Sequence, residues 1–264
     1  MQSNPIKRLV KGLRDYRQSH YCTHQDLFEQ LSHGQKPRVL FITCSDSRID
    51  PNLLTQTDLG ELFVIRNAGN IIPPYGATNG GEGAAVEYAI HALGIEEVIV
   101  CGHSHCGAMK GLLKLPKLEE DMPLVYEWLR HTEATRRLLK ENYSHLEGED
   151  LIEVAVAENV LTQLENLRTY PVIHSRMHQG KLNLYGWIYQ IENAEVLAYN
   201  PNSDEFEPIL HDLPACDLPN TAPSNGLEQT VQHQIQQIEL DRKYSEGWLS
   251  PGQAERIYRG SHAR

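Results

Sequence analysis

Two apolar runs end in loops that carry soft metal ligands, and this pattern limits the possible folds more than any other feature of the chain. The segment Val98–Cys101 leads into a glycine-bracketed loop with His103 and Cys106, and the segment Val39–Thr43 leads into Cys44. Continuous apolar runs of this length are typical of strands buried on both faces of a parallel sheet. Ligands gather near the carboxyl ends of such strands, where both loops are expected.

Helical patterns alternate with strand patterns over residues 36–208, which predicts one α/β domain. We expect an open, mainly parallel sheet of four or five strands with helices on its faces. An Asn-Ala turn separates the last two strands and favours an antiparallel pair at the sheet edge. The expected strands cover residues 39–43, 62–65, 97–101, 182–191 and 196–199. Two of the expected helices start near residue 79 and after residue 106, and others lie within 122–148 and 150–168.

Residues 1–35 and 209–264 flank this domain and differ from it in composition. In the first segment, apolar side chains such as Leu9 and Leu13 recur at helical spacing among charges, which predicts a helical arm. The arm packs either on its own domain or on a second copy, and the sequence leaves both open. The second segment begins with a proline-rich linker and continues with a glutamine-rich, weakly apolar stretch, which fits either a docking helix or a disordered extension.

An excess of acidic residues limits the partners of this protein. Asp and Glu number 35 and Lys and Arg 24, whereas nucleic acids and anionic membranes select basic surfaces. No apolar run approaches the roughly 18 residues of a membrane span, and the charged amino-terminal region does not resemble a signal peptide. The odd number of cysteines, 5, argues against a disulfide framework and favours a reducing cytoplasm.

Cys44, His103 and Cys106 form a ligand set typical of catalytic zinc. Zinc binds thiolates and imidazoles tetrahedrally, and three protein ligands leave one position for water, whose pKa the metal lowers towards about 7. Asp46 and Arg48 follow the first ligand closely, and an arginine fork keeps the carboxylate ionised, as a hydrogen-bond acceptor. An open metal position beside this pair favours hydration of a small electrophile.

Other residues near these motifs have plainer interpretations. His105 competes as a ligand, but we expect it to face solvent or to be hydrogen-bonded, and we expect Cys101 to lie in the core. Arg66 is interpreted as an ordinary charge at a strand end. The glycines at 80–83 lack the Lys and the spacing of a phosphate loop, which favours close helix packing. Two further cysteines in polar surroundings are interpreted as incidental, Cys22 and Cys216.

The segments Cys44–Arg48 and Gly102–Gly107 together resemble the signature of the β-class carbonic anhydrases. Residues 66–70 and 87–88 also resemble this family, and the resemblance covers about residues 30–200. It implies a carbonate dehydratase, a zinc lyase that catalyses the reaction CO2 + H2O ⇌ HCO3− + H+. It also implies that the Cys and His of the two segments bind one zinc ion per subunit, with the Asp and Arg as catalytic dyad.

The same resemblance assigns four residues to the small CO2 pocket, namely Gln35, Phe63, Ala68 and Tyr88. In the family the Gln often reaches in from the partner subunit. The resemblance therefore implies a homodimer, or an assembly of dimers, with sites at the interface, which would explain the long arm. One subgroup of the family is closed by bicarbonate bound beside the metal and has a Trp where this chain has Phe41. We therefore expect Asp46 to pair with Arg48, with water completing the metal's ligands.

A carboxyl-terminal extension occurs among cyanobacterial carboxysomal relatives, where it is linked to docking on shell or scaffold proteins. By that resemblance, the enzyme supplies CO2 for carbon fixation inside a carboxysome in the cytoplasm and docks there through residues 211–264. Two alternatives stay open: hydrolysis of another small linear electrophile such as CS2, as in some relatives, and a scaffold protein whose zinc is only structural. A thiol redox enzyme is disfavoured, because the chain has no C-x-x-C pair.

Overall fold

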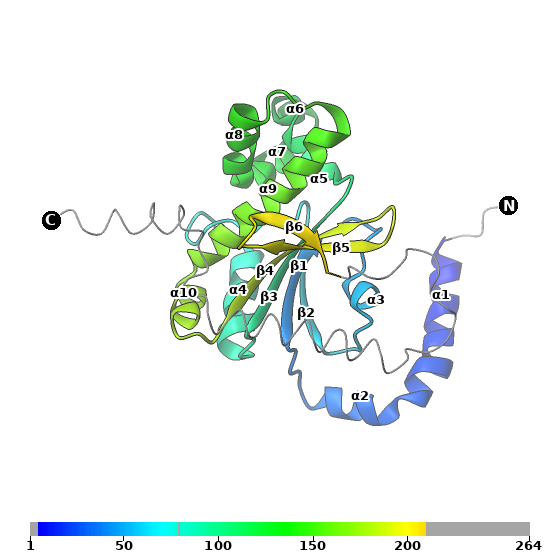
Figure 1. Ribbon diagram of the computed structural model, residues 1–264. Helices are drawn as coiled ribbons and strands as arrows, with labels where there is room; N and C mark the ends of the chain where they lie inside the picture. The colour runs from blue at the N-terminus through cyan, green and yellow to red at the C-terminus, as the bar shows by residue number, and fades with distance from the viewer. Residues whose placement is uncertain (1–4, 79, 210–264) are drawn as a thin grey trace.

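The computed structural model describes residues 5–78 and 80–209, which are built around one six-stranded sheet (Figure 1). The strands lie in the order β2-β1-β3-β4-β5-β6, and the first four are parallel while the last two pair antiparallel. The predicted α/β fold with a mainly parallel sheet is confirmed. The strand bounds are β1 Val39–Cys44, β2 Leu62–Asn67, β3 Glu97–His103, β4 Asn183–Gln190, β5 Glu195–Asn200 and β6 Glu205–Pro208.

The sheet has one strand more than the four or five that we expected, and the extra strand is β6. Its sequence Glu-Phe-Glu-Pro has no continuous apolar run, and its residues are poor strand formers apart from Phe206. It forms at the edge of the sheet, where a proline is tolerated because one side of the strand needs no hydrogen-bond partner. The predicted antiparallel pair β4–β5 is present, but β6 rather than β5 is the edge strand.

The predicted helices are present, several of them interrupted by short turns. The helix expected near residue 79 is α4 (Gly81–Glu87), which continues as the π-helical turn η2 (Tyr88–Ala92) and stops at Gly94, whose φ is +72°. The remaining elements of the body are α3 Pro51–Thr55, α5 Gly107–Leu112, η3 Leu115–Lys117, α6 Leu118–Asp121, α7 Pro123–Leu129, η4 Arg130–Thr132, α8 Glu133–Asn142, α9 Gly148–Arg168 and α10 Pro171–His178.

Helix α9 packs directly on strands β3 and β4, and a glycine in each strand permits this close approach. A Cβ atom at Gly102 would stand 2.9 Å from side-chain carbons of Val156 and Val160, and one at Gly186 would stand 3.0 Å from Val160. Because Gly102 directly precedes His103, the close packing fixes the end of β3 where that histidine begins the loop.

The two faces of the sheet are covered by separate groups of buried residues. On β1, Leu40, Ile42 and Cys44 belong to the main core with α9, whereas Phe41 belongs to a smaller cluster with Cys101. Alternation of side chains along a strand explains this division. Cys101 is fully buried on the face opposite Cys44, as expected of a core residue, and cannot join the ligand set.

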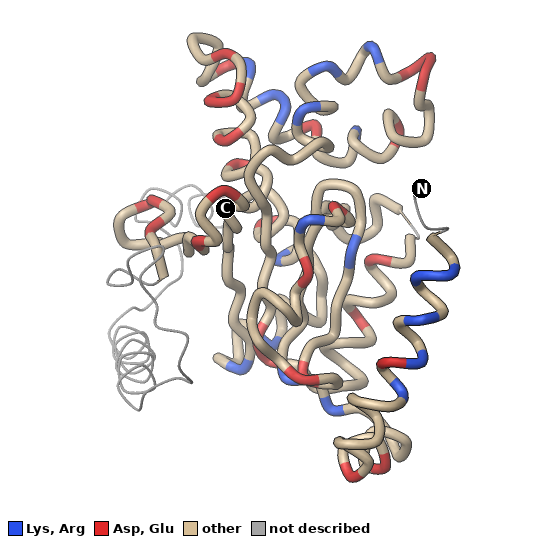
Figure 2. Tube along the Cα trace, turned by 90° about the vertical axis from the view of Figure 1, so that its right-hand side faces the viewer, with Lys and Arg blue, Asp and Glu red and all other residues tan. Residues whose placement is uncertain are grey.

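The amino-terminal arm is helical, as predicted, but its first helix buries no residue within its own chain. The arm consists of α1 (Pro5–Asp15), the π-helical turn η1 (Tyr16–Tyr21) and α2 (Gln25–Ser32), and it stands beside the sheet (Figure 1). The side chains of Leu9 and Leu13 are 63% and 69% exposed. Figure 2 shows basic residues along the same helix.

Within residues 5–78 and 80–209, no helix is both long and apolar enough to cross a membrane. The predicted extension lies outside the described residues apart from its first residue, Ile209. The boundaries at residues 35 and 208 stay predictions.

Candidate metal centre

Parallel pairing brings the three predicted ligands together at the carboxyl ends of strands β1 and β3. Thr43 of β1 lies level with Cys101 of β3, so Cys44 and the loop after β3 leave the sheet side by side. Cys106 precedes the first turn of α5. The ligand atoms of Cys44, His103 and Cys106 all lie within 4.8 Å of one another, and the three side chains are buried.

The histidine of this group is oriented as a metal ligand. Its Nδ1 donates a hydrogen bond of 2.8 Å to the carbonyl oxygen of Ser104, which leaves a lone pair on Nε2. Nε2 is buried and has no hydrogen-bond partner among the described residues. A buried polar atom without a partner destabilises a fold, and zinc ligands commonly hold the second ring nitrogen in this way. An imidazole nitrogen and two sulfurs at this spacing fit a zinc ion.

The two thiols divide into one that ionises readily and one that does not. A hydrogen bond from Cys106 lowers the pKa of Cys44 most, and the nearby His103 side chain and the backbone N–H groups of Gly69 and Asp46 lower it further. The neighbouring Cys44 sulfur and burial raise the pKa of Cys106. A thiolate is therefore already stabilised at Cys44, and a bound cation would favour ionisation of both thiols.

Asp46 and Arg48 form the expected bidentate pair beside the ligand group. Arg48 donates from Nε to Oδ1 at 2.9 Å and from Nη2 to Oδ2 at 2.8 Å, and its backbone N–H donates to Oδ1 at 3.0 Å. These bonds hold the pKa of Asp46 well below its usual range. Its Oδ2 lies 3.9 Å from Nε2 of His103. The carboxylate is therefore an ionised acceptor next to the ligand atoms.

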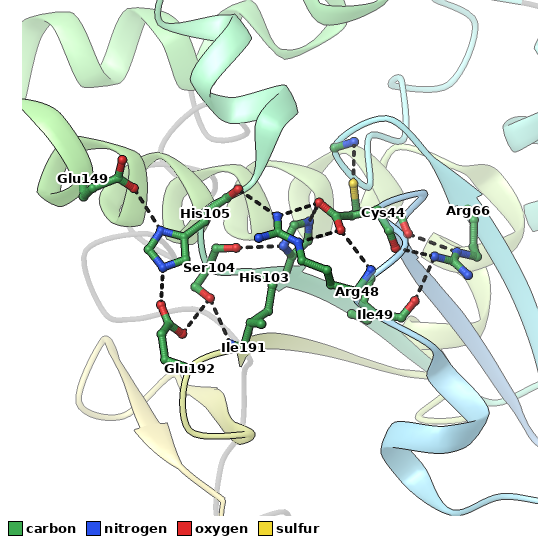
Figure 3. Close-up of polar contacts among 12 residues, drawn as sticks. Cys44, Arg48, Ile49, Arg66, His103, Ser104, His105, Glu149, Ile191 and Glu192 are labelled. Carbon is green, nitrogen blue, oxygen red and sulfur yellow. Dashed lines mark hydrogen bonds and ion pairs between the residues drawn. The ribbon is translucent and has the colours of Figure 1, made fainter. Parts of the chain in front are cut away.

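Arg66 has a larger part in the site than the strand-end charge that we expected. Its guanidinium donates to the carbonyl oxygens of Cys44 at 3.1 Å, Asp46 at 2.7 Å and Ile49 at 2.8 Å (Figure 3). It thus fixes the backbone that carries both a ligand and the carboxylate. The sequence places Arg66 at a strand end, but only the pairing of β1 with β2 brings its side chain to these carbonyls.

His105 is hydrogen-bonded, as expected, and its ring is held by two carboxylates. Nδ1 contacts Glu149 of α9 at 2.9 Å, and Nε2 contacts Glu192 in the turn after β4 (Figure 3). The pKa of His105 is raised, chiefly by Glu149. The carbonyl oxygen of His105 accepts a 3.2 Å hydrogen bond from Arg48. The two glutamates therefore anchor the loop between the ligands, and that loop contacts the Arg48 side of the carboxylate pair.

Ser104 ties the same loop to the sheet. Its Oγ donates to Glu192 at 2.9 Å and accepts from the backbone N–H of Ile191 at 3.0 Å. No sequence pattern pointed to Glu149 or Glu192, because each lies more than one element away from the loop it contacts.

Only one of the four expected pocket residues lies beside the ligand group in a single chain. Ala68 precedes Gly69, whose N–H donates to Sγ of Cys44 at 3.4 Å. The rings of Phe63 and Tyr88 lie 6.1 Å apart, but towards the other end of the sheet. Phe63 is level with Leu40, four residues before the Cys44 level, a separation of about 13 Å along the strands.

Gln35 is exposed and precedes the amino end of β1, whereas Cys44 ends that strand. A six-residue strand separates them, so one chain cannot place Gln35 beside its own ligand group. Within one chain, Gln35 and Phe63 therefore lie towards the opposite end of the parallel strands from the ligand group, and the assignment of the four residues to a CO2 pocket stays a prediction.

The remaining interpretations of single cysteines, glycines and Phe41 have different outcomes. Cys22 is exposed, and Cys216 lies outside the described residues. Close packing holds for Gly83, where a Cβ atom would stand 3.2 Å from the hydroxyl oxygen of Tyr170, but a Cβ atom at Gly81 would meet no neighbour within 4 Å. Phe41 packs edge-on against Trp187 in the smaller cluster, away from the ligands.

Comparison with known proteins agrees with this geometry. Residues 39–196 match the carbonic anhydrase family. The solved structure of the β-carbonic anhydrase CcaA is 69% identical and superposes with a TM-score of 0.77, over 78% of this chain and 100% of that one. This chain belongs to the β-class carbonic anhydrase family. The reaction implied by its sequence motifs, reversible hydration of CO2 to bicarbonate, is the reaction of this family.

Two curated carbonic anhydrases match this β-class chain almost from end to end. The enzyme of Synechocystis sp. is 58% identical over 97% of this chain and 100% of its own length. That of Synechococcus elongatus is 56% identical over 97% of this chain and 99% of its own length. A tetrameric β-carbonic anhydrase of Sordaria macrospora, 23% identical with a TM-score of 0.66 over 74% of this chain and 97% of that one, shares the fold.

Proposed function

We propose that this β-class enzyme hydrates CO2 at one zinc ion per chain, held by Cys44, His103 and Cys106, with Asp46 and Arg48 as the catalytic pair. The observation that carries the proposal is the buried Nε2 of His103, which has no partner in the described protein and points to a ligand role. Zinc, when bound, supplies a Lewis acid that makes water a competent nucleophile near neutral pH.

The chain's own groups orient the reactants. Asp46 is ionised and held by Arg48, so it accepts a hydrogen bond beside the ligand atoms and does not take a proton at neutral pH. It therefore acts by orientation and not as a general base. Arg48 is held in turn by its bond to the carbonyl of His105, which limits movement of the carboxylate. The proton released by hydration passes to buffer.

The ligand assignment predicts that zinc content depends on these three side chains. Cys106→Ser and His103→Ala are expected to lower bound zinc at least about tenfold, since even loss of a group behind a ligand lowers metal affinity by about 10-fold or more. Metal analysis of purified, folded protein measures the effect. Cys101→Ala is the matched control, because this buried thiol lies on the opposite face. Full zinc in Cys106→Ser would contradict the assignment.

The catalytic pair is tested by Asp46→Asn in stopped-flow CO2 hydration with a pH indicator. We expect kcat to fall about a hundredfold or more at unchanged zinc content, because the amide cannot form the ionised pair with Arg48. The control is Asp50→Asn, since Asp50 caps α3 by accepting from the Leu53 N–H and an Asn also serves as a cap. Wild-type rates in Asp46→Asn would reject the role of the carboxylate.

The same assay separates the alternative readings. Bound zinc without CO2 hydration in the wild type would favour hydrolysis of a small electrophile such as CS2, or a scaffold with a vestigial site. The paired carboxylate next to a three-ligand group supports hydration instead, because a structural zinc site has four protein ligands.

We further propose that the enzyme works as a homodimer or an assembly of dimers. Three pocket residues lie far from their own ligand group, and a second copy would bring its Gln35, Phe63 and Tyr88 to that site. The apolar face of α1 supports this arrangement, because Leu9 and Leu13 are exposed and no α1 residue is buried. The helix is basic within a chain of net charge -11, which favours its contact with another copy (Figure 2).

The double variant Leu9→Glu and Leu13→Glu is expected to weaken this assembly. Burying two carboxylates in an apolar contact is unfavourable, so the oligomer should dissociate at lower protein concentration and CO2 hydration should fall with it. Light scattering coupled to size-exclusion chromatography measures the mass. Leu124→Glu is the control, since Leu124 is 85% exposed on α7. An unchanged mass in the double variant would reject the role of the arm.

We propose that the enzyme supplies CO2 for carbon fixation inside a carboxysome and docks on a shell or scaffold protein through residues 211–264. The relatives from Synechocystis and Synechococcus match 97% of this chain, a share that includes most of this segment. The zinc site lies wholly outside it, so catalysis and docking are separable.

Deletion of residues 211–264 is expected to disperse a fluorescent fusion from carboxysome foci into the cytoplasm of a carboxysome-forming cell. CO2 hydration by the purified truncated enzyme should stay within about twofold of the full chain, because the ligands and the carboxylate pair are retained. Foci that persist after the deletion would reject docking through this segment.

A further inference from the structure

The peptide group between Ala68 and Gly69 is held at both of its polar ends. Its N–H donates to Sγ of Cys44 at 3.4 Å. Its carbonyl oxygen, that of Ala68, accepts a 2.8 Å hydrogen bond from the indole Nε1–H of Trp128 in α7. One peptide therefore connects the ring of a half-buried tryptophan to a sulfur of the ligand group.

The next peptide is held as firmly. The carbonyl oxygen of Gly69 accepts a 2.9 Å hydrogen bond from Nδ2 of Asn159, which is 1% exposed in α9. Asn159 is itself bonded to Thr132 at 2.9 Å and to Gln163 at 2.9 Å. Gln163 also accepts from the backbone N–H of Ile72 at 2.8 Å. This buried network therefore also holds the loop that contains Gly69.

Only glycine fits at the centre of this arrangement. Gly69 has a φ of +83°, and a Cβ atom there would stand 2.9 Å from Cβ of Ala108 and 3.1 Å from Cε of Met109. Left-handed backbone at this residue turns its N–H towards the sulfur, and side chains of α5 close the space around it. The position of the N–H is therefore set by packing as well as by hydrogen bonds.

A donor on the oxygen of an amide polarises the amide and strengthens its N–H as a donor. Trp128 thus strengthens the bond that Gly69 makes to Cys44. A hydrogen bond to a ligating thiolate withdraws electron density from sulfur, and groups behind metal ligands tune the metal in this way. Two thiolates donate strongly to a metal, so such a bond would restore part of its Lewis acidity.

We propose that Trp128 is a positioning residue of the metal centre. It orients and polarises the Ala68–Gly69 peptide, and the N–H of this peptide then withdraws electron density from the thiolate of Cys44. This inference rests on the proposed zinc site. The hydrogen bond of Trp128 goes to the carbonyl oxygen of Ala68, so we expect it to act on Cys44 through this peptide.

The variant Trp128→Phe removes the indole N–H and keeps an aromatic ring. In the cobalt-substituted protein, we expect the sulfur-to-cobalt charge-transfer band to move to lower energy, because the thiolate becomes more electron-rich. The metal should be released to a chelator about tenfold faster, because loss of a group behind a ligand lowers metal affinity. We also expect kcat to fall with KM unchanged. The matched control is Trp187→Phe, since Trp187 packs on Phe41 in the other cluster and should leave band and release rate unaltered.

A second replacement separates the hydrogen bond from packing. Benzothienylalanine at position 128 keeps the size of the indole but has sulfur in place of the N–H, so it should reproduce the band shift even where Trp128→Phe folds poorly. A band and a release rate equal to wild type in this protein would overturn the inference. If the wild-type enzyme holds zinc and hydrates CO2, that result leaves the proposed function intact. A wild-type enzyme that binds no metal would instead reject the proposed function itself.

Discussion

The parallel register between β1 and β3 is the constraint on which the rest of the site depends. It makes two strands end side by side, and it places Cys44 and the His103 loop at the same buried edge. The Nε2 lone pair of His103 is buried there and has no hydrogen-bond partner among the described residues. A metal ion that satisfies this atom contributes directly to the stability of the fold, because binding to the folded state alone favours that state.

The metal ligands lie at strand ends and in loops, so the loop backbone must keep its conformation without the hydrogen bonds of a helix or a strand. His105 and Asn70 have left-handed backbone, with φ of +52° and +49°, although neither is glycine. Conformations of this kind persist where surrounding contacts determine them. The carboxylates of Glu149 and Glu192 on His105 are such contacts. The guanidinium of Arg66 likewise holds three carbonyls in and after β1. They come from α9, from the turn after β4 and from β2, so the site is held by the whole sheet.

The same sheet geometry explains why the residues expected to line the pocket do not gather at the ligand group within one chain. Ligands lie at the carboxyl ends of the parallel strands, while Gln35 and Phe63 lie towards the amino ends. No rearrangement of side chains spans the length of a strand. An exposed apolar helix in the arm is consistent with the same conclusion, since such a face is normally covered in the functional state.

Local pattern and residue chemistry were sufficient to predict the strands β1 to β5, the long helix α9 and the group Cys44, His103 and Cys106. Continuous apolar runs indicate buried strands, and cysteine and histidine side chains next to the strand ends indicate a metal site. Strand β6 was not predicted, nor were the three carbonyl contacts of Arg66 or the hydrogen bonds that Glu149, Trp128 and Asn159 make near the ligands. These depend on which distant elements pack together. Strand order, register and helix packing result from many long-range contacts, and only the tertiary structure decides which side chains those contacts bring to the ligands.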